Sequence, residues 1–362
     1  MARAGGGGAA RGGAAGAGQR SPSALQCGSV ATYIYFIPVL LALNLLCLVW
    51  SRWTALAWLV YTLYINLGPG RWAAKTGSWP KLLRRARWWT HCAAYFPCTL
   101  HKTAELDPGG RYIFVAAPHG VVTMYAWPCF DTDACGFSRL FPGIEVHPMT
   151  LELNFRLPLM REFLLAHGVV DASRAACLMT LGRGPGQAIL LAVGGAQESL
   201  LAAPGSYDLV CAPRRAAAQP HRRGGARRAA GRARDAPAPA PAPAPAPGEN
   251  ELYDTSLPAP GSLRARLQRG LKATLGFTLP AARGRGPLGL MPWAKPLNVV
   301  VGAPVEFDPS ALLAGEAKGE EVGLEAFVDA YHAQYVAALR ALWDAHKAKY
   351  ADGRRKSLDI VE

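Results

Sequence analysis

The stretch YIFVAAPHGVV, residues 112–122, decides the fold class of this 362-residue chain. Residues 112–116 form a short apolar run with β-branched and aromatic members, which predicts a buried strand. Pro118 stops such a strand and Gly120 allows a sharp turn, so His119 stands where the strand ends. Ligands of open α/β sheets bind beyond the carboxyl ends of strands, so this histidine is a candidate for chemistry. A purely structural histidine fits the same local pattern, and both interpretations stay open at this point.

The rest of the chain after residue 100 alternates between apolar strands and helical stretches. Further strands are predicted at residues 168–170, 188–193 and 297–301, with helices at 157–166 and 175–181. This alternation indicates an α/β domain with a largely parallel sheet. A long amphipathic helix follows, because the following residues recur at helical spacing: Leu324, Phe327, Val328, Tyr331, Tyr335, Leu339, Leu342 and His346. His332 and His346 are interpreted as residues of this helix and not as ligands.

Three strand ends are expected to converge, at residues 118–119, 171–173 and 194–195. The last of them opens VGGAQESL, in which Gly194 and Gly195 let the backbone pass close to a ligand. Glu198 follows this turn, either as an acceptor for a substrate hydroxyl or as an acid favoured by the helix dipole. The sequence alone leaves these two roles open. The stretch GRGPG at residues 182–186 precedes a strand and is interpreted as a turn.

Charge and cysteine content exclude some classes of protein. The formal net charge is +14, and residues 211–234 hold eight arginines and no acid, without the aromatic residues of a nucleic-acid patch. The remaining excess of positive charge suits an anionic membrane face or an anionic co-substrate. The eight cysteines form no C-x-x-C pair, so we expect no metal site and interpret them as reduced thiols facing the cytosol.

Residues 30–68 predict a membrane hairpin. The uncharged run at 30–50 spans about 30 Å as a helix, and a shorter run from residue 54 is expected to return or re-enter. Arginines and lysines flank the hairpin on both sides, which places both termini in the cytosol. Residues 1–29 are expected to be a disordered tail, and residues 69–100 a connector whose LLRRARWW segment, residues 82–89, lies on the membrane surface.

The combination of one histidine, one carboxylate and a membrane hairpin suits proton removal from an alcohol beside a bilayer. No G-x-S-x-G elbow, H-E-x-x-H motif or Walker loop is present in the sequence.

Several ordered blocks of the chain resemble the type-2 diacylglycerol acyltransferase family, which includes monoacylglycerol and wax-ester acyltransferases. YIFVAAPHGVV resembles its H-P-H-G block. The other matching blocks are AYFP (94–97), FPGIEVHPMTLELNFRLPLMREFLLAHGVVDASR (141–174), VGGAQESL (193–200), GENELYD (248–254), LGLMPWAKPLNVVVGAPVEF (288–307) and YHAQYVAALRALWDAHKAKY (331–350). The likeness covers most of residues 90–350.

The resemblance implies a membrane-anchored α/β domain of the glycerolipid-acyltransferase type at residues 101–350. It implies acyl transfer from acyl-CoA, a co-substrate, to a lipid alcohol, with no bound cofactor, and triacylglycerol synthesis from diacylglycerol. His119 matches the family's general base and Glu198 a glutamate that contacts the glycerol moiety. The implied substrate-binding residues are Pro118, Gly120, Asn154, Arg156, Gly194 and Gly195, with Arg156 assigned to phosphate or coenzyme A.

The resemblance also implies partners and a location. Membrane lipids and acyl-CoA are the expected partners, nucleic acid is not, and a homo-oligomer stays open. The expected location is the endoplasmic reticulum membrane, with lipid droplets as a further site. Two alternatives stay open: a monoacylglycerol or fatty-alcohol acyltransferase, and an inactive, membrane-anchored lipid-binding relative.

The chain departs from the family pattern at two places. Ala117 replaces the first residue of the H-P-H-G block, a position that varies. The second departure is residues 211–247, where an arginine-rich and then alternating Ala-Pro segment replaces a helix and a core strand. Proline at every second position predicts that this low-complexity segment is no central strand but polyproline-like or disordered. A reading-frame or splice error, or a tolerated low-complexity loop, accounts for such a segment. Residues 351–362 are expected to form a tail.

Overall fold

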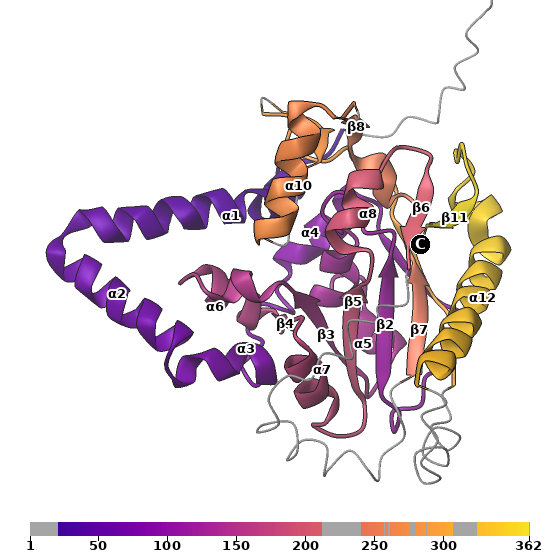
Figure 1. The fold of residues 1–362 in the computed structure, drawn as a ribbon, viewed down its shortest axis with the longest axis horizontal. Coiled ribbons are helices and arrows are strands. Elements are labelled where there is room, and N and C mark those ends of the chain that lie inside the picture. Colours follow the sequence, from indigo (N-terminus) through magenta and orange to yellow (C-terminus); the bar gives the residue numbers. More distant parts are fainter. Residues whose placement is uncertain are drawn as a thin grey trace, which may run out of the picture.

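A five-stranded parallel sheet forms the centre of the domain (Figure 1). The computed structural model describes residues 21–211, 240–256, 258–259, 261–275, 280–286, 288–306 and 324–361. In spatial order the strands are β4 (Val170–Asp171), β3 (Glu145–Thr150), β5 (Gln187–Ala192), β2 (Tyr112–Ala117) and β7 (Ala240–Pro245). All neighbours run parallel, so their carboxyl ends share one edge. The predicted strands at 112–116 and 188–193 are confirmed, and that at 168–170 begins two residues later.

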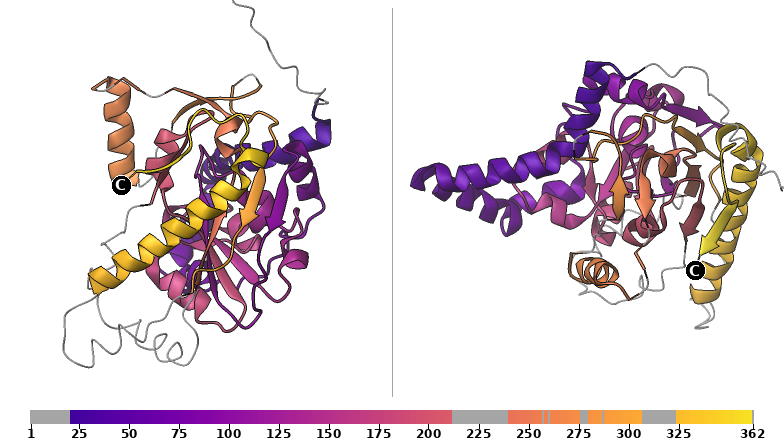
Figure 2. Two further views of the ribbon diagram at one scale, coloured as in Figure 1. Left: turned by 90° about the vertical axis from the view of Figure 1, so that its right-hand side faces the viewer. Right: turned by 90° about the horizontal axis from the view of Figure 1, so that it is seen from above.

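Helices and shorter strand pairs surround this sheet (Figure 2). The helices are α3 (Ala73–Thr76), α4 (Trp88–Tyr95), α5 (Phe137–Leu140), α6 (Met160–Ala166), α7 (Arg174–Leu181), α8 (Gly195–Leu201), α10 (Leu263–Leu275) and α12 (Leu324–Tyr350), with short η1 (Pro69–Trp72), η2 (Trp127–Asp131), η3 (Glu152–Phe155) and η5 (Glu249–Leu252). The strand pairs are β1 (Thr99–Lys102) with β10 (Asn298–Val301), β6 (Tyr207–Val210) with β11 (Leu358–Val361), and β8 (Asp254–Ser256) with β9 (Ala281–Arg283). The predicted helices are confirmed as α6, α7 and α12, and the predicted strand at 297–301 as β10.

Strand β2 is buried on both faces, as its continuous apolar sequence requires. Successive side chains point to opposite faces, so Phe114 joins the main core, which also contains Trp127 of η2. Val115 faces the other way and packs in a second cluster with Tyr335 and Leu339 of α12. The strand that carries His119 is therefore held between two hydrophobic layers.

The Ala-Pro segment forms strand β7, which corrects the expectation that its prolines exclude a strand. The in-plane direction of the backbone N–H and C=O groups alternates from residue to residue along a strand. In β7 the alanines point these groups toward β2, and the prolines point their carbonyls away from β2. Ala246, just after the strand, likewise donates to the Ala117 carbonyl at 2.8 Å. Proline has no backbone N–H, so it costs no hydrogen bond on the side of the strand where only carbonyls are used. Pro243 there accepts from the N–H of Gly302 at 3.0 Å. Residues 212–239 lie outside the described residues, and the reading-frame hypothesis stays a prediction that sequencing of the transcript tests.

Both predicted tails are shorter than expected. Helix α1 begins at Ala24, where Ser23 accepts a hydrogen bond from the N–H of Gln26, so residues 24–29 belong to a helix. Residues 1–20 lie outside the described residues. At the other end, Leu358–Val361 form β11 and pair with β6, so most of the predicted tail at 351–362 is part of the domain.

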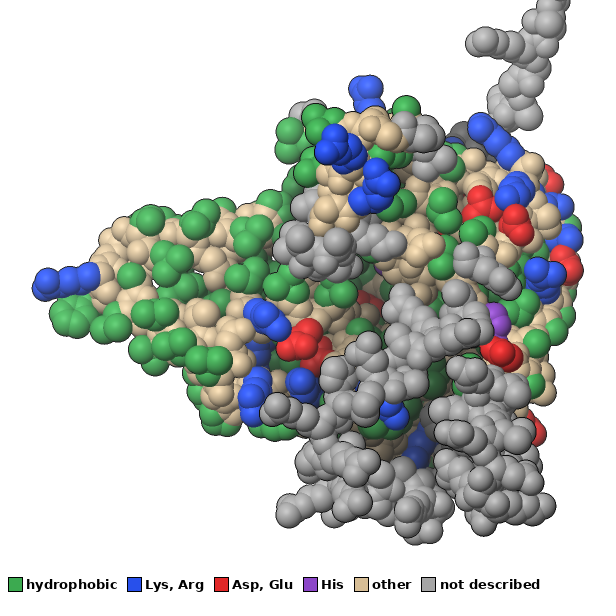
Figure 3. Space-filling model, viewed as in Figure 1, with side chains coloured by type: hydrophobic (Ala, Val, Ile, Leu, Met, Phe, Trp, Pro, Cys, Tyr) green, Lys and Arg blue, Asp and Glu red, His purple; other side chains and the backbone are tan. Residues whose placement is uncertain are grey.

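Helices α1 (Ala24–Trp50) and α2 (Arg52–Asn66) project from the domain as a two-helix arm that turns at Ser51 (Figure 1). Apolar side chains cover this arm (Figure 3), and Val49, Trp50 and Trp53 near its tip are 67–77% exposed. Helix α1 is long and apolar enough to cross a membrane, with a mean hydropathy of 2.2 over its best window. Helix α2 has 15 residues, fewer than the about 17 that a full span needs.

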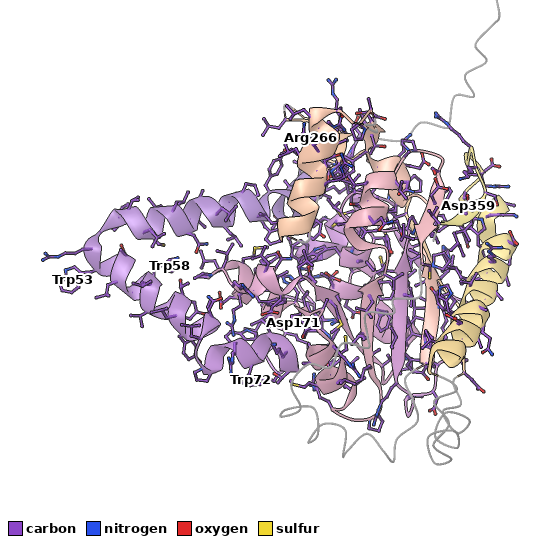
Figure 4. All side chains as sticks on the ribbon, in the orientation of Figure 1. Trp53, Trp58, Trp72, Asp171, Arg266 and Asp359 are labelled. Atoms are coloured by element: carbon purple, nitrogen blue, oxygen red, sulfur yellow. The ribbon has the colours of Figure 1, made fainter. Side chains whose placement is uncertain are left out.

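Polar contacts join the arm to itself and to the domain. The Asn44 side chain donates to the Pro158 carbonyl at 3.0 Å and accepts from Trp58 Nε1 at 2.8 Å (Figure 4). The 82–89 segment, by contrast, does not lie wholly on the surface. Arg84 turns inward to the carbonyls of Val146 and Phe130 at 2.7 and 2.8 Å, and Trp89 is buried in the main core. The prediction of a surface stretch is therefore wrong for these two residues.

Candidate active site

His119 stands two residues beyond the end of β2, at the edge shared by the carboxyl ends of the sheet. Pro118 separates it from the strand, and Gly120 has a φ of 59°, in the left-handed region that favours glycine. The ring Nδ1 lies 3.2 Å from the Gly120 carbonyl oxygen. If Nδ1 carries the proton and donates to this carbonyl, Nε2 is left with a lone pair. The local chain thus presents the imidazole as a base.

His119 lines a cavity of about 320 Å³ at this edge of the sheet. Strands β2, β3 and β5 contribute the floor with their last residues, and α1 contributes one apolar wall with Tyr33, Ile34, Phe36 and Ile37. The polar lining residues are His119, Thr123, Asp131, Thr150 and Asn154. The imidazole is thus enclosed between a few polar groups and the helix that is apolar enough to span a bilayer.

Burial sets the charge of the imidazole. Removal from solvent lowers the pKa of His119 from its usual value, against the opposing effect of its contact with the Gly120 carbonyl. The ring is therefore neutral at neutral pH and can accept a proton. This is the protonation state that a general base needs.

Glu198 lies behind the His119 turn, on the first turn of α8. Its carboxylate accepts hydrogen bonds from the backbone N–H of His119 and from that of Val210, the latter at 3.1 Å. Burial raises the pKa of Glu198 to about 7, against the effect of these two donors. Gly194 gives it room, because a Cβ there would come within 1.9 Å of the Glu198 carboxylate. Among the described residues, Glu198 does not line the His119 cavity, so its contacts position the turn.

A second carboxylate, Glu249, holds a later part of the same turn. Its side chain accepts from the N–H of Met124 at 2.8 Å and from that of Tyr125 at 3.1 Å. Burial raises the pKa of Glu249 to about 8, again against the effect of the two N–H donors. A Cβ on Gly120 would lie 2.4 Å from Glu249, so the glycine is required by this close approach as well as by its φ. The sequence analysis gave Glu249 no role, although the residue stands in the quoted GENELYD block.

Asp131 is a further group that the sequence analysis missed. It ends η2, is buried, and lines the cavity together with His119. Desolvation raises the pKa of Asp131 to about 7, opposed by the positive charge of Arg84. Its Oδ1 has no hydrogen-bond partner among the described residues. The only sequence feature that could have indicated Asp131 is its position at the end of the otherwise apolar stretch WPCFD, residues 127–131.

The predicted substrate-binding residues separate into two places. Asn154 lines the His119 cavity and donates to Thr150 Oγ1 at 2.9 Å, whereas Gly195 begins α8 with a φ of 47°. Arg156 instead lines a second cavity of about 510 Å³ at the base of the arm, where its Nη2 lies 3.5 Å from Glu152 Oε1.

The end of β4 also lines this second cavity. Asp171 lines it, as does Trp72 near the end of the arm (Figure 4). Its basic residues are Arg71, Lys75, Arg156 and Arg161. The expected convergence of three strand ends is therefore correct for β2 and β5 and wrong for β4, because Asp171 turns toward the arm.

Comparison with known proteins adds an independent result. Residues 46–360 match the family model described as diacylglycerol acyltransferase. Diacylglycerol O-acyltransferase 2B of Umbelopsis ramanniana is 34% identical over 93% of this chain and 91% of its own length, and 2A of the same fungus is 37% identical over 80% and 78%. Acyl-CoA wax alcohol acyltransferase 1 of Homo sapiens is 32% identical over 76% of this chain and 80% of its own. No solved structure matches the chain.

Proposed function

This chain belongs to the diacylglycerol acyltransferase family and is an acyltransferase, and we propose that it transfers an acyl group from acyl-CoA to the free hydroxyl of diacylglycerol. The product would be triacylglycerol. The observation that carries the proposal is a neutral, half-buried histidine at a strand end, in a cavity walled by the apolar helix α1. A lipid alcohol can enter such a cavity from a bilayer.

The reaction needs one base and no covalent enzyme intermediate. His119 takes the proton of the acceptor hydroxyl as its oxygen attacks the thioester carbonyl carbon. The tetrahedral species then collapses, the carbon–sulfur bond breaks and the ester forms. The imidazolium returns the proton to the departing coenzyme A thiolate, so His119 ends neutral.

Glu198 and Glu249 would act through the backbone of the turn that carries His119. Each carboxylate accepts two backbone N–H groups, and together they fix the chain on both sides of the imidazole. Within this proposal they are positioning residues. Asn154 and Asp131 would contact the acceptor in the cavity, and the basic cavity with Arg156 would take phosphate groups of coenzyme A.

The arm would anchor the enzyme in the membrane, with α1 and α2 inserted and both termini in the cytosol. Its exposed apolar surface supports insertion, and Arg71, Lys75 and Arg85 follow it on the proposed cytosolic side. The proposed location is the endoplasmic reticulum membrane. Helix α2 would enter the bilayer without crossing it fully, since it is too short for a complete span.

Wax-ester or monoacylglycerol synthesis is the second candidate, favoured by the likeness to the human wax alcohol acyltransferase. The test is purified protein in lipid nanodiscs with labelled acyl-CoA and separate diacylglycerol, monoacylglycerol and fatty-alcohol acceptors. We expect the highest kcat/KM with diacylglycerol. A higher value with a fatty alcohol would move the assignment to the second candidate. No product with any acceptor would support the inactive relative.

A further inference from the structure

Three of the eight cysteines meet at η2, and none of the three lines the His119 cavity. Cys98 lies between α4 and β1, Cys129 is inside η2, and Cys135 follows in the next loop. Their three Sγ atoms all lie within 4.8 Å of one another, and those of Cys98 and Cys129 are 3.5 Å apart. The sequence contains no C-x-x-C pair, so only the fold brings these thiols together.

This spacing is close to that of a thiolate set around one ion. Tetrahedral coordination with a zinc–sulfur distance of about 2.3 Å puts neighbouring sulfurs roughly 3.8 Å apart. The three sulfurs therefore need to move by no more than about 1 Å to share an ion. Cysteines also pack in cores simply as small apolar residues. Such packing accounts for two thiols in contact but does not require a third sulfur at the same point.

The polar contacts and the ligand chemistry of the cluster also favour a metal site. The Cys135 thiol also donates to the Cys98 carbonyl oxygen at 3.7 Å, so a polar contact joins these two residues. Cys129 is fully buried in the main core. Thiolates select soft metal ions over the hard cations Mg²⁺ and Ca²⁺.

We propose that Cys98, Cys129 and Cys135 bind one soft divalent metal ion, with Zn²⁺ as the expected occupant. Cys98, Cys129 and Cys135 each release a proton to solvent on binding, and the ion with its three thiolates carries a net charge of −1. A water molecule would be the fourth ligand. This site is separate from the acyl-transfer cavity and takes no part in the reaction.

The site would be structural. It ties the start of β1 and the end of α4 to η2, which carries Trp127 and Asp131 to the His119 cavity. Metal binding in such a place stabilises the folded chain because the unfolded chain lacks a preformed ligand set. Loss of the ion would loosen the cavity wall without removing any group that contacts the acceptor.

The test is metal analysis of the full-length protein, purified in detergent under reducing conditions without a metal-affinity tag. We expect one zinc ion per chain in the unaltered protein and in the control Cys177→Ser, whose sulfur lies beside Met149 outside the cluster. Zinc should be lost from Cys98→Ser, Cys129→Ser and Cys135→Ser. Full zinc content in the triple variant would overturn the proposal.

A second measurement on the unaltered chain avoids variants that fail to fold. The rate of alkylation of each cysteine is followed by mass spectrometry with added Zn²⁺ and with a chelator. We expect Zn²⁺ to slow alkylation of the three cluster cysteines and to leave Cys177 unchanged. Equal rates with zinc and with chelator, or a disulfide between Cys98 and Cys129 in the reduced preparation, would contradict the proposal.

Discussion

At the residue scale, the proposed chemistry would depend on backbone contacts made by two buried carboxyl groups. Glu198 and Glu249 both contact the His119 turn, and both accept from backbone N–H groups instead of from the imidazole. Gly194 and Gly120 are the residues whose missing side chains make these approaches possible. The histidine is therefore held by its main chain, and its ring stays free to meet a substrate.

The lowered pKa of His119 predicts the pH dependence of catalysis. A base works only when neutral, so activity is lost as pH falls through the pKa of the imidazole. Burial places this pKa below its usual value, so the acid limb of kcat/KM against pH should bend below about 6.5. Initial rates at saturating acyl-CoA and varied acceptor across pH 5–8 give this limb. An acid limb centred above pH 7 would rule out this assignment of the base.

Replacing Glu249 should affect both stability and rate. Glu249→Ala leaves the N–H groups of Met124 and Tyr125 without their acceptor, at about 1–3 kcal/mol for each unsatisfied buried group. Glu249→Gln keeps one acceptor oxygen and should cost less. We expect the melting temperature and kcat to fall in the order unaltered protein, Gln, Ala, with the exposed Glu105→Gln as control. Unchanged kcat in the alanine variant would show that Glu249 does not position the turn.

At the element scale, β7 shows how alternating prolines can form a strand. The prolines take one side of the strand, where only carbonyls are used, and the alanines take the side that donates to β2. Local composition could not predict this, because it depends on which neighbour lies on which side. Proline is tolerated where no N–H is needed and excluded where one is.

A matched pair of substitutions tests this account of β7. Ala246→Pro removes the N–H that donates to the Ala117 carbonyl, next to the His119 turn, and should destabilise the protein by about 1–3 kcal/mol. Pro241→Ala keeps the accepting carbonyl and should change stability little. Thermal unfolding of both variants in detergent measures the difference. Equal melting temperatures would contradict the assigned sides of the strand.

Sequence patterns predict some strands of the domain and miss others for a physical reason. Strands β2, β5 and β10 follow from continuous apolar runs, whereas β3 contains Glu145, His147 and Pro148 and shows no such run. His147 is fully buried, and its ring contacts the Gly168 carbonyl and Arg183, which the fold supplies from distant positions. Likewise, the sequence predicts His119 as a site residue because it stands at the end of a strand, but it does not predict Glu249. Its partners lie about 125 positions earlier in the chain, and no local pattern records that contact.

At the scale of the whole molecule, the arm sets the orientation of the enzyme. The apolar helices α1 and α2 turn back at Ser51, so the domain and the N-terminal end of α1 lie at the same end of the arm (Figure 1). Membrane insertion of the arm then leaves both termini on one side. In the proposed orientation this is the cytosolic side, as the excess of arginine and lysine around the arm would favour.

Protease protection in sealed microsomes tests this topology. Epitope tags at the N- and C-termini should both be digested by external protease without detergent. A tag inserted beside Arg52, at the turn of the arm, should be protected. Protection of the C-terminal tag would place the domain in the lumen and contradict the proposed orientation.

The most direct test of the central claim, that His119 is the base of an acyl-CoA-dependent transfer, is the rate of the His119→Ala variant. The full chain and a His346→Ala control, whose ring contacts the Leu342 carbonyl on α12, are assayed with labelled acyl-CoA and diacylglycerol. The account predicts a fall in kcat of about 10²–10⁴ for His119→Ala, with normal expression and membrane insertion, and no comparable fall for the control. Near-normal kcat in the His119→Ala variant would contradict the claim.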